Sequence, residues 1–557
     1  MDVTSLNFIE ALPVIIDEIR RCDFVAIDTE MSGLLRDRSS NRFDLPYERY
    51  AKTVESSRGY FIMQFGLSCF TRMKNTDLNY TNRTYNFYIF PQAEEHYGDE
   101  NRTYSVEAHA IQFLTKHNFD FNKLFKHGVS YLTFQEKKVL IAKLKDERKA
   151  RKGCSFSDPP QLSELPRFVP KPMKNDCLNW VSKVKTLISL VQLGRREPNK
   201  GLDIVECSTN HKRRILRRVL ESSNMIKNLD IQDKHDPKRG ETHIYVEFIE
   251  ESEKERKQNR SITAAIGFFE ILEQVIANKK PVVGHNLFLD LIQIMNQFIE
   301  PLSEDYNAFK ETIHSLFPYI YDTKYVAHSI LEAETLTRNQ SKLEDLYAQL
   351  KDGKEFPRIS IEHHGEFVDE NQAPHQAGYD AYMSGYCFIS LCESYLRELR
   401  KKNKEKVNPV DLPALPMNEV VLEEFVNKIH LSYSHDFKCY DLGGDEIEPS
   451  REHVFYVQHP ESWELDDLFQ LFHQFGGIEH SKLGRSSTLC ALRNPNPSNI
   501  KSVLNGSDMK SGANYTIHSY QSYVQEHKNR RGGKRKVASP VVSNEEESDD
   551  LEVGMIS

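Results

Sequence analysis

Two carboxylates, Asp28 and Glu30, end an apolar run that begins at Phe24. The run predicts a buried strand, and because side chains alternate between the two faces of a strand, both acids point the same way. Two buried acids on one face repel each other unless a cation lies between them, and their hard oxygen atoms suit Mg2+ or Mn2+. The pattern indicates a metal site, although an acidic turn in solvent at the end of a strand fits these two residues equally well.

Two later motifs add to this pattern. Residues 281–290 predict a short strand, a glycine-containing turn and the first turn of a helix that carries Asp290. His375 and Asp380 stand at the start of an apolar, helix-like run. The order D-x-E, a lone D, then H-x-x-x-x-D is typical of the DEDDh exonucleases, and the three parts together are far more specific than any one of them.

The composition is that of a folded, soluble protein. The chain has 557 residues, of which 39% are hydrophobic and 28% charged, and this excludes a mainly disordered chain. The length predicts about three or four domains. The nine cysteines form no C-x-x-C pair, so neither a zinc site nor a disulfide framework is indicated, and a reducing compartment fits best. The amino terminus lacks a signal-peptide pattern and no apolar run approaches the ~20 residues of a membrane span, so we expect no membrane association.

The net charge of −9 argues against a nucleic-acid partner until the charges are located, since binding depends on local patches. Basic residues cluster at residues 212–218 and 528–536. The second cluster fits nuclear import or a nonspecific phosphate contact, and a tail that only adds solubility is its alternative.

Changes in composition predict the domain boundaries. Prolines accumulate over residues 155–174, charges over residues 250–260, and polar residues with prolines over residues 400–416. Such stretches are typical of linkers. We therefore expect a first domain in two parts, residues 1–165 and 261–400, with a small domain at residues 175–248 inserted between them.

Strands alternate with helices through the first domain, which predicts a mixed α/β sheet. Residues 60–70 and 86–90 predict neighbouring strands of an antiparallel ladder that extends the sheet begun at Phe24. Residues 453–492 show the β-α-β order of an RNA-recognition-motif (RRM) fold, and we place that domain at residues 449–525. Residues 526–557, basic and then acidic, are expected to be a disordered tail.

With the acids, several further runs make the sequence resemble the poly(A)-specific ribonucleases over roughly residues 1–525. These runs are Phe43-Asp44, residues 46–50, Phe65-Gly66-Leu67, Asn86-Phe87-Tyr88, residues 119–123, Val283-Gly284-His285-Asn286, Asp322-Thr323-Lys324, residues 375–382 and Phe388-Ile389-Ser390. The resemblance implies an RNase H-like DEDD exonuclease fold, which is a mixed sheet flanked by helices. It also implies an inserted small α/β nucleic-acid-binding domain, named for an Arg-x-x-x-His motif, and a C-terminal RRM-like α/β domain.

The resemblance also implies the roles of the site residues. Asp28, Glu30, Asp290 and Asp380 would hold two Mg2+ ions, which Mn2+ can replace, with His375 as general base. The residues matching the family's RNA path are Met31, Leu34, Ile111, Phe113 and Lys324. Apolar groups there accept stacked bases and the lysine accepts phosphate, while core packing is the alternative for the four apolar residues. RNA 3′ ends and poly(A) as partners and a homodimer follow from the same resemblance, and we expect a location in cytoplasm and nucleus.

Two departures from the family pattern bear on RNA recognition. In the family, a tryptophan after the second strand of the RRM stacks on the mRNA cap, and Lys482 occupies the equivalent place here, so cap binding is doubtful. The Arg-x-x-x-His signature of the inserted domain is degenerate around residues 211–218, although its basic residues remain.

These observations predict a 3′-to-5′ exoribonuclease of the poly(A)-specific type, which shortens RNA 3′ ends by two-metal hydrolysis and releases 5′-nucleotides. Its expected reaction is removal of poly(A) from mRNA or non-coding RNA. Trimming of small-RNA precursors, such as piRNA precursors, by the same site is an alternative. A catalytically inactive RNA-binding scaffold is a second alternative, against which the presence of all five catalytic residues argues.

Overall fold

The computed structural model describes residues 1–35, 40–73, 78–91, 102–152, 169–197, 200–221, 229–237, 240–331, 342–365, 375–403, 422–507 and 514–532. The chain divides into two compact units. The first contains Met1–Gln92, Asn101–Val129 and Ile271–Ser557, and the second contains Ala93–Glu100 and Ser130–Glu270.

The core of the first unit is a mixed sheet, which the described residues build from nine strands in the order β1-β4-β3-β2-β8-β9-β11-β12, with β10 paired to β4. The strands are β1 (Asp2–Val3), β2 (Phe24–Met31), β3 (Ile62–Arg72), β4 (Asn79–Tyr88), β8 (Val282–Gly284), β9 (Ile320–Asp322), β10 (Ser360–His363), β11 (Lys428–His430) and β12 (Cys439–Asp441). Strands β2, β3 and β4 pair antiparallel, while β2, β8 and β9 pair in parallel. The predicted mixed α/β sheet is confirmed.

Strand β4 begins at Asn79, seven residues before the expected start at residue 86. The sequence did not predict this first part of the strand, because its polar residues interrupt the apolar alternation that marks a half-buried strand. In the structure their side chains bond across the ladder: Asn82 donates to Ser68 Oγ at 2.7 Å, and Ser68 and Thr84 hydroxyls lie 2.8 Å apart. Hydrogen bonds between neighbouring strands thus satisfy the buried polar groups.

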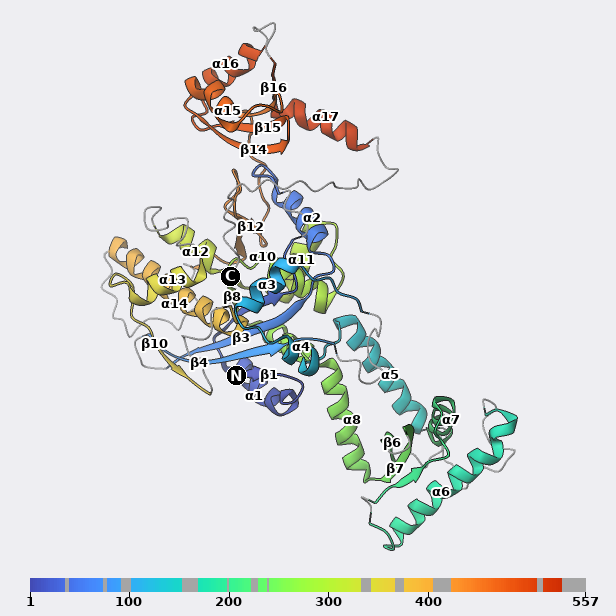
Figure 1. Cartoon of the computed structure of the whole chain (residues 1–557). Helices are drawn as coiled ribbons and strands as arrows, with labels where there is room; N and C mark the ends of the chain where they lie inside the picture. Colours follow the sequence, from blue (N-terminus) through green and yellow to red (C-terminus); the bar gives the residue numbers. More distant parts are fainter. Residues whose placement is uncertain are drawn as a thin grey trace. The chain divides into compact units, whose positions relative to one another are not determined.

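Helices surround this sheet, and Figure 1 shows α12, α13 and α14 gathered together in yellow and orange. They are α1 (Phe8–Arg21), α2 (Pro46–Ser57), α3 (Ala108–Lys116), α4 (Phe121–His127), α10 (Phe288–Ile294) with a π-helical turn (Met295–Ile299), α11 (Tyr306–Leu316), α12 (Thr323–Ile330), α13 (Leu343–Asp352) and α14 (Ala377–Asn403). Helix α14 packs against β2, β3, α12 and α13, and every residue from Ala377 to Glu393 is buried. A helix that is apolar on most sides belongs in the core of a domain.

The C-terminal domain is an antiparallel sheet in the order β14-β15-β13-β16. Its elements are β13 (Val454–Gln458), α15 (Leu465–Phe472), β14 (Ile478–Gly484), β15 (Ser487–Leu492), α16 (Pro497–Ser507), β16 (Thr516–Ser519) and α17 (Tyr520–Gly532). The β-α-β order that the sequence predicted is present, and Lys482 lies within β14. Helix α17 runs past residue 525, the expected end of the domain, and the tail from residue 533 lies outside the described residues.

One face of the C-terminal sheet is packed against a segment from the start of the chain. Phe43, which is 2% exposed, lies in an apolar cluster with Val454, Leu489 and Ala491. These three residues alternate along β13 and β15 with the residues of the domain's own core, so they occupy the opposite face of the sheet. Phe43 therefore covers part of the face that the two helices α15 and α16 leave open.

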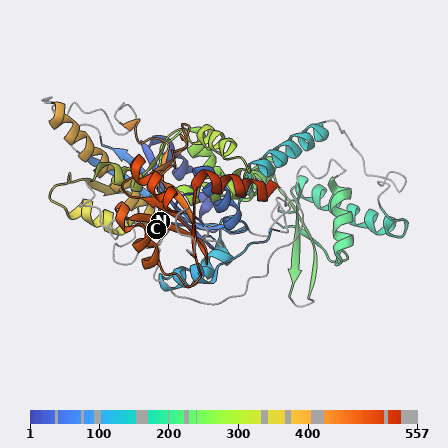
Figure 2. The same ribbon diagram turned by 90° about the horizontal axis from the view of Figure 1, so that it is seen from above.

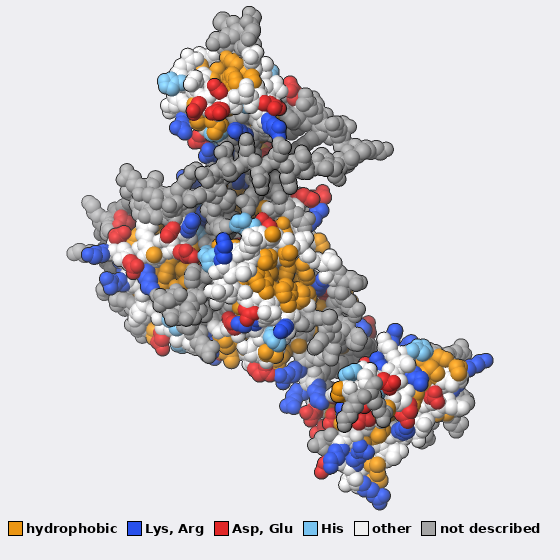
Figure 3. Space-filling view, in the orientation of Figure 1, with side chains coloured by type: hydrophobic (Ala, Val, Ile, Leu, Met, Phe, Trp, Pro, Cys, Tyr) orange, Lys and Arg blue, Asp and Glu red, His pale blue; other side chains and the backbone are white. Residues whose placement is uncertain are grey.

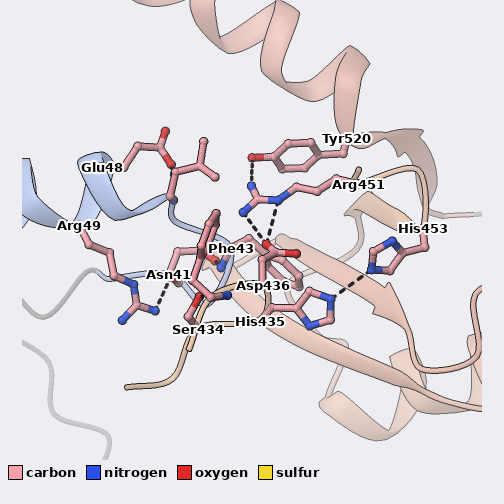
Figure 4. A network of polar contacts seen from close by, with 12 residues as sticks. Asn41, Phe43, Glu48, Arg49, Ser434, His435, Asp436, Arg451, His453 and Tyr520 are labelled. Atoms are coloured by element: carbon pink, nitrogen blue, oxygen red, sulfur yellow. Dashed lines mark hydrogen bonds and ion pairs between the residues drawn. The ribbon is translucent and has the colours of Figure 1, made fainter. Parts of the chain in front are cut away.

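A polar network fixes this contact (Figure 4). Arg451 donates from Nε and Nη2 to Asp436 Oδ2 at 3.0 and 2.6 Å, and both side chains are almost completely buried. His435 lies 2.9 Å from Glu479 and 3.1 Å from the ring of His453. The segment that follows β11 is thus bound to the C-terminal domain at two places, just before β13 and at the start of β14.

The second unit has its own sheet and core. Strands β5 (Leu202–Ile204), β6 (Leu229–Asp236) and β7 (Glu241–Phe248) pair in the order β5-β7-β6. Its helices are α5 (Phe134–Lys152), α6 (Lys174–Gln192) with a 3-10 turn before it at Lys171–Met173, α7 (Asn210–Glu221) and α8 (Glu251–Ile266). Helix α9 (Phe269–Ala277) begins at the end of this unit and belongs mostly to the first. Trp180 on α6 and Leu216 on α7 lie in one apolar core with Val246 on β7, and both views show α6, α7 and this sheet side by side (Figures 1 and 2).

The charge run at residues 250–260 differs from the prediction of a linker, because it is the first part of helix α8. Charges three residues apart face each other on a helix, and Arg256 lies 3.3 Å from Glu253. Such pairs stabilise a helix that buries little apolar surface. Within the described part of the chain, no helix combines the length and the apolar character that crossing a bilayer requires.

Candidate active site

The register of β2 and β3 makes room for the third acid of the site. Gly66 on β3 lies opposite Asp28 on β2. A Cβ atom on Gly66 would be 1.8 Å from the carbonyl oxygen of Ala377, the first residue of α14. The absent side chain therefore lets the start of α14 approach the sheet at the level of Asp28, and this brings Asp380, one turn further along α14, to the acids of β2.

Asp28, Glu30 and Asp380 form a compact cluster. One carboxylate oxygen from each of them lies within 4.8 Å of the other two. Asp28 is 8% and Asp380 1% exposed, and Glu30 is half-buried. Neither oxygen of Asp380 accepts a well-formed hydrogen bond among the described residues, and the backbone N–H of His375 gives it only a minor electrostatic contact. Buried polar groups are normally paired, so a carboxylate with two orphaned oxygens beside two other acids fits a bound cation.

Asp290 contacts strand β2 from helix α10. It lies in the first turn of α10, after β8, which pairs in parallel with β2. Its Oδ1 accepts a hydrogen bond of 2.5 Å from the hydroxyl of Thr29, the residue between the two acids of β2. The structure thus brings three of the four expected carboxylates into one cluster and places the fourth beside it.

Burial and mutual repulsion make these acids hold their protons. Burial is the main cause that raises the pKa of Asp28, and the charges of Asp380 and Asp290 add to it. Burial likewise raises the pKa of Glu30 and of Asp380, followed by repulsion from neighbouring acids. Burial also raises the pKa of Asp290 to about 7. A divalent cation at these oxygens would reverse the balance and favour all the ionised forms.

His375 lies just before the helix that carries Asp380. Its backbone has a φ of +66°, a left-handed conformation that non-glycine residues rarely adopt. Its Nε2 lies 3.3 Å from Glu344 Oε1, and its ring packs 3.9 Å from that of His117 and 4.7 Å from that of Phe113. Burial, followed by His117, lowers the pKa of His375 to about 4, well below that of an ordinary histidine. The ring is therefore neutral near pH 7 and has a lone pair to accept a proton.

Apolar side chains wall the pocket above the acids. Met31, Leu34 and Phe113, three of the expected RNA contacts, line it together with His375, and so do His285 and Leu289. Ile111 does not line this pocket; it packs against the apolar cluster around Leu114. Lys324 lies on the first turn of α12 and is also outside the pocket lining.

Sequence reasoning missed several residues that shape the site. Thr29 holds Asp290, Glu344 and His117 contact His375, and Asp322 ties the turn before α10 to α12. The sequence offers one signal for Asp322, because an aspartate directly before a helix is a common cap, and this marks it as structural. For Glu344 and His117 the chain offers no local signal, because they come from elements far away in sequence.

The basic helix of the second unit is partly neutralised. Asp233 on β6 pairs with Arg217 at 2.9 Å and lies 3.4 Å from Arg213, both on α7. Arg213 also donates to the backbone oxygens of Ser208 and Thr242. Around α6 and α7, blue and red side chains are interspersed on the face shown in Figure 3. These two arginines therefore brace the fold of the unit.

Comparisons with known proteins show the family to which the chain is similar. The chain matches the CAF1 family ribonucleases over residues 3–388 and an RNA binding domain over residues 444–526. It is 30% identical to poly(A)-specific ribonuclease PARN of Homo sapiens, over 96% of this chain and 82% of that protein. It is 29% identical to PARN of Xenopus laevis, over 97% and 83% respectively.

Two further proteins are similar over a smaller part of the chain. The pre-piRNA 3′-exonuclease trimmer of Bombyx mori is 30% identical, over 70% of this chain and 71% of that protein. A solved structure of S. pombe Pop2p, in its Mg2+ and Mn2+ bound form, is 16% identical with a TM-score of 0.33, covering 72% of this chain and 92% of that one.

Proposed function

The chain belongs to the CAF1 family of ribonucleases, and from this membership and the acidic cluster we infer that it is a 3′-to-5′ exoribonuclease that removes poly(A) from RNA. The observation that carries the inference is the cluster of three carboxylates in which Asp380, almost completely buried and contacted among the described residues only by the backbone N–H of His375, lies next to Asp28 and Glu30. A structural aspartate in this position would have acquired partners, because an unpaired buried charge is costly.

The donor set supports divalent metal ions as cofactors. Asp28, Glu30 and Asp380 would hold one Mg2+ or Mn2+, and Asp290 would complete the set for a second ion. When bound, the metal supplies an activated water and charge stabilisation for hydrolysis of a phosphodiester. Thr29 keeps Asp290 oriented by donating from its hydroxyl to Oδ1 of that carboxylate.

His375 fits the role of general base. Its neutral ring can take the proton of the attacking water, and Glu344, 3.3 Å from its Nε2, stabilises the imidazolium that results. His375 comes directly before helix α14, which carries Asp380. The same segment of the chain therefore positions both the general base and a metal ligand.

The pocket walls favour an unpaired 3′-terminal nucleotide as substrate. Met31, Leu34 and Phe113 offer apolar contacts on which a base can stack, directly above the acids that would hold the metal. Poly(A) as the substrate is supported by the relatives that are poly(A)-specific ribonucleases and match almost the whole chain. The C-terminal RNA binding domain supports RNA over DNA.

A second candidate reaction uses the same site. The similarity to a pre-piRNA trimming exonuclease, and the exposed Lys482 where the family carries a cap-stacking tryptophan, favour uncapped small-RNA precursors. Removal of poly(A) has the wider support, because the PARN relatives match through the C-terminal domain.

Assembly and location are two further proposals. The poly(A)-specific ribonucleases imply a homodimer, which light scattering at micromolar concentration would test. The basic residues at 528–536 support entry into the nucleus in addition to the cytoplasm.

The test of the proposed reaction uses purified protein and a 5′-labelled oligo(A). With Mg2+ or Mn2+, we expect stepwise shortening from the 3′ end and release of AMP, and no shortening with a chelator. A substrate with a blocked 3′ hydroxyl is the matched control and should stay intact. Shortening that persists in the chelator would overturn the metal-dependent reaction.

A further inference from the structure

A groove of about 1480 Å3 lies away from the active site and shares no lining residue with the pocket above the acids. The start of α2, the turn before α11 and the loop after β12 supply part of its lining. The sheet of the C-terminal domain and the start of α17 supply the rest. Small-molecule pockets usually measure about 300–1,000 Å3. The size of the groove therefore favours a peptide segment over a small molecule as its occupant.

Carboxylates outnumber cations in the lining of this groove. Seven acidic side chains line it, against two lysines, and one of these, Lys52, is already paired with Asp44 at 2.8 Å. Glu304, Asp445 and Glu448 are exposed, and no described residue forms an ion pair with any of them. An excess of negative charge attracts a cationic partner and repels the phosphates of RNA. The groove therefore suits a basic peptide.

Arg451 shows how a cation is bound in the wall of this groove. It donates to Asp436 at 2.6 Å, and its guanidinium carbon lies over the ring of Tyr520, 4.8 Å from the ring centroid (Figure 4). Tyr520 itself lines the groove. The carboxylate neutralises the charge of the arginine, while the negative face of the aromatic ring attracts it from another direction.

Lys310 repeats this arrangement at another place in the wall. Its ammonium nitrogen lies 3.0 Å from Glu446 Oε2 and 5.2 Å from the ring centroid of Tyr306. Both partners line the groove, and the lysine is buried behind them. A carboxylate together with a tyrosine therefore binds a cation of the chain at two places along this groove.

Tyr47 and Glu448 form a third combination of this kind. Burial, followed by the negative charges of Glu48 and Glu448, raises the pKa of Tyr47, so both carboxylates act on its hydroxyl. Arg451 has the smallest of these effects, in the opposite direction. Tyr47 is 48% exposed, and among the described residues no cation lies over its ring and none pairs with Glu448. This third site is therefore open to a cation from outside the chain.

We propose that this groove docks an arginine-containing peptide segment of a partner protein, with an arginine side chain between Tyr47 and Glu448. A guanidinium suits this site better than an ammonium, because it is planar, stacks on an aromatic ring and donates two parallel hydrogen bonds to a carboxylate. Further basic residues of the peptide pair with Glu304 and Asp445 at other places in the lining. Docking here is independent of the proposed reaction, since the groove and the active-site pocket share no residue.

The test measures, by fluorescence anisotropy, the binding of a labelled decapeptide of alternating arginine and glycine to the full chain. We expect a micromolar Kd for the parent and an increase of at least about tenfold in both Glu448→Gln and Tyr47→Ala. Lys482→Gln should lower the Kd about twofold, because it removes a cation from the lining of the groove. The same peptide with lysine in place of arginine should bind more weakly than the arginine peptide.

Two substitutions outside the groove are matched controls. Tyr319→Ala removes a tyrosine that is 43% exposed, and Glu461→Gln neutralises an exposed acid of the C-terminal domain; neither residue lines the groove. Both should leave the Kd of the peptide unchanged. A Kd for Tyr47→Ala and Glu448→Gln equal to that of the parent would overturn the docking site. Equal weakening in the two controls would also overturn it, because net charge alone would then hold the peptide.

Two other occupants would give different results. If the chain's own basic residues after α17 fill the groove, the combined variant Lys534→Gln, Arg535→Gln and Lys536→Gln should bind the peptide at least about tenfold more tightly than the parent, and the assignment to a partner is wrong. If the groove takes RNA, Tyr47→Ala should weaken the binding of a labelled oligo(A) in a chelator, and the peptide site is wrong. We expect each variant to match the parent in its own measurement, which supports a peptide from a partner protein.

Discussion

Gly66 and Ala377 approach so closely that a methyl group on Gly66 would lie 1.8 Å from the carbonyl oxygen of Ala377. We expect Gly66→Ala to push the start of α14 away from the sheet, separating Asp380 from Asp28, and to cost about 1–3 kcal/mol of stability. Activity should fall more than the stability loss explains. Gly443→Ala is the control, since the nearest atom to its added carbon is 3.5 Å away. Full activity in Gly66→Ala would show that the separation of sheet and helix is not critical.

Asp380→Asn should abolish turnover while leaving the fold intact. The change removes the charge of a buried acid that repels its neighbours, so thermal stability without metal should hold or rise, and activity should drop by more than about a hundredfold. The same outcome is expected for Asp28→Ala and Glu30→Ala. Asp17→Asn, at an exposed ion pair on α1, is the matched control. A melting temperature well below that of the parent would instead assign these acids a structural role.

The pH dependence of the metal-free protein follows from the raised pKa values. Burial raises the pKa of Asp28, of Glu30 and of Asp380, and that of Asp290 to about 7. An acid whose pKa is higher in the folded state stabilises that state fully below its ordinary pKa of about 4, and this stabilisation is lost as the pH rises through the folded-state value.

The measurement is thermal unfolding in a chelator between about pH 7 and about pH 8.5, above the ordinary pKa range of carboxylic acids. We expect the melting temperature to fall by several degrees over this range. Mg2+ should restore stability, and more strongly at the higher pH, because it replaces the protons that the acids have lost. A melting temperature independent of pH and of Mg2+ would contradict a cation site at these acids.

The acids could be predicted from sequence because each is reported by its own local pattern. Asp28 and Glu30 follow an apolar strand, and Asp380 sits at the start of an apolar helix. The environment of His375 could not be predicted in this way, because Glu344 on α13 and His117 at the end of α3 contact it only in the folded chain. Burial among these elements, followed by the neighbouring His117, lowers the pKa of His375.

The same distinction applies to the fold. The alternation of strands and helices predicted the sheet, but the early start of β4 could not be predicted. Its polar residues Asn82 and Thr84 find their partner, Ser68, only on the neighbouring strand. The packing of Phe43 on the C-terminal sheet was likewise invisible, because a phenylalanine in a polar, turn-rich stretch carries no mark of its distant partners. What sequence patterns record is local periodicity, and these features depend on contacts between segments far apart in the chain.

The buried ion pair between Arg451 and Asp436 should anchor the C-terminal domain. Both side chains are almost completely buried, so Arg451→Met leaves an unpaired buried carboxylate and should destabilise the contact by about 3–5 kcal/mol. Denaturant unfolding would measure it, and the double variant Arg451→Met with Asp436→Leu should recover much of the loss. Arg256→Met at the exposed pair with Glu253 should change stability by less than about 1 kcal/mol. No recovery in the double variant would show that Arg451 acts mainly through Tyr520, its other partner.

Deadenylation should be nearly indifferent to a 5′ cap. Lys482 is exposed on β14 and offers charge attraction but no stacking surface, which is worth about 1–3 kcal/mol per base. The aromatic side chains near it are already engaged: Tyr456 stacks on Tyr523 with ring centroids 4.7 Å apart, and Phe43 covers the adjoining part of the sheet. The test compares initial rates on capped and uncapped RNAs of one sequence and titrates free cap analogue against the full chain. A rate gain of several-fold, lost in Tyr456→Ala, would show that this tyrosine leaves Tyr523 to stack on the cap, and the expected indifference would be wrong.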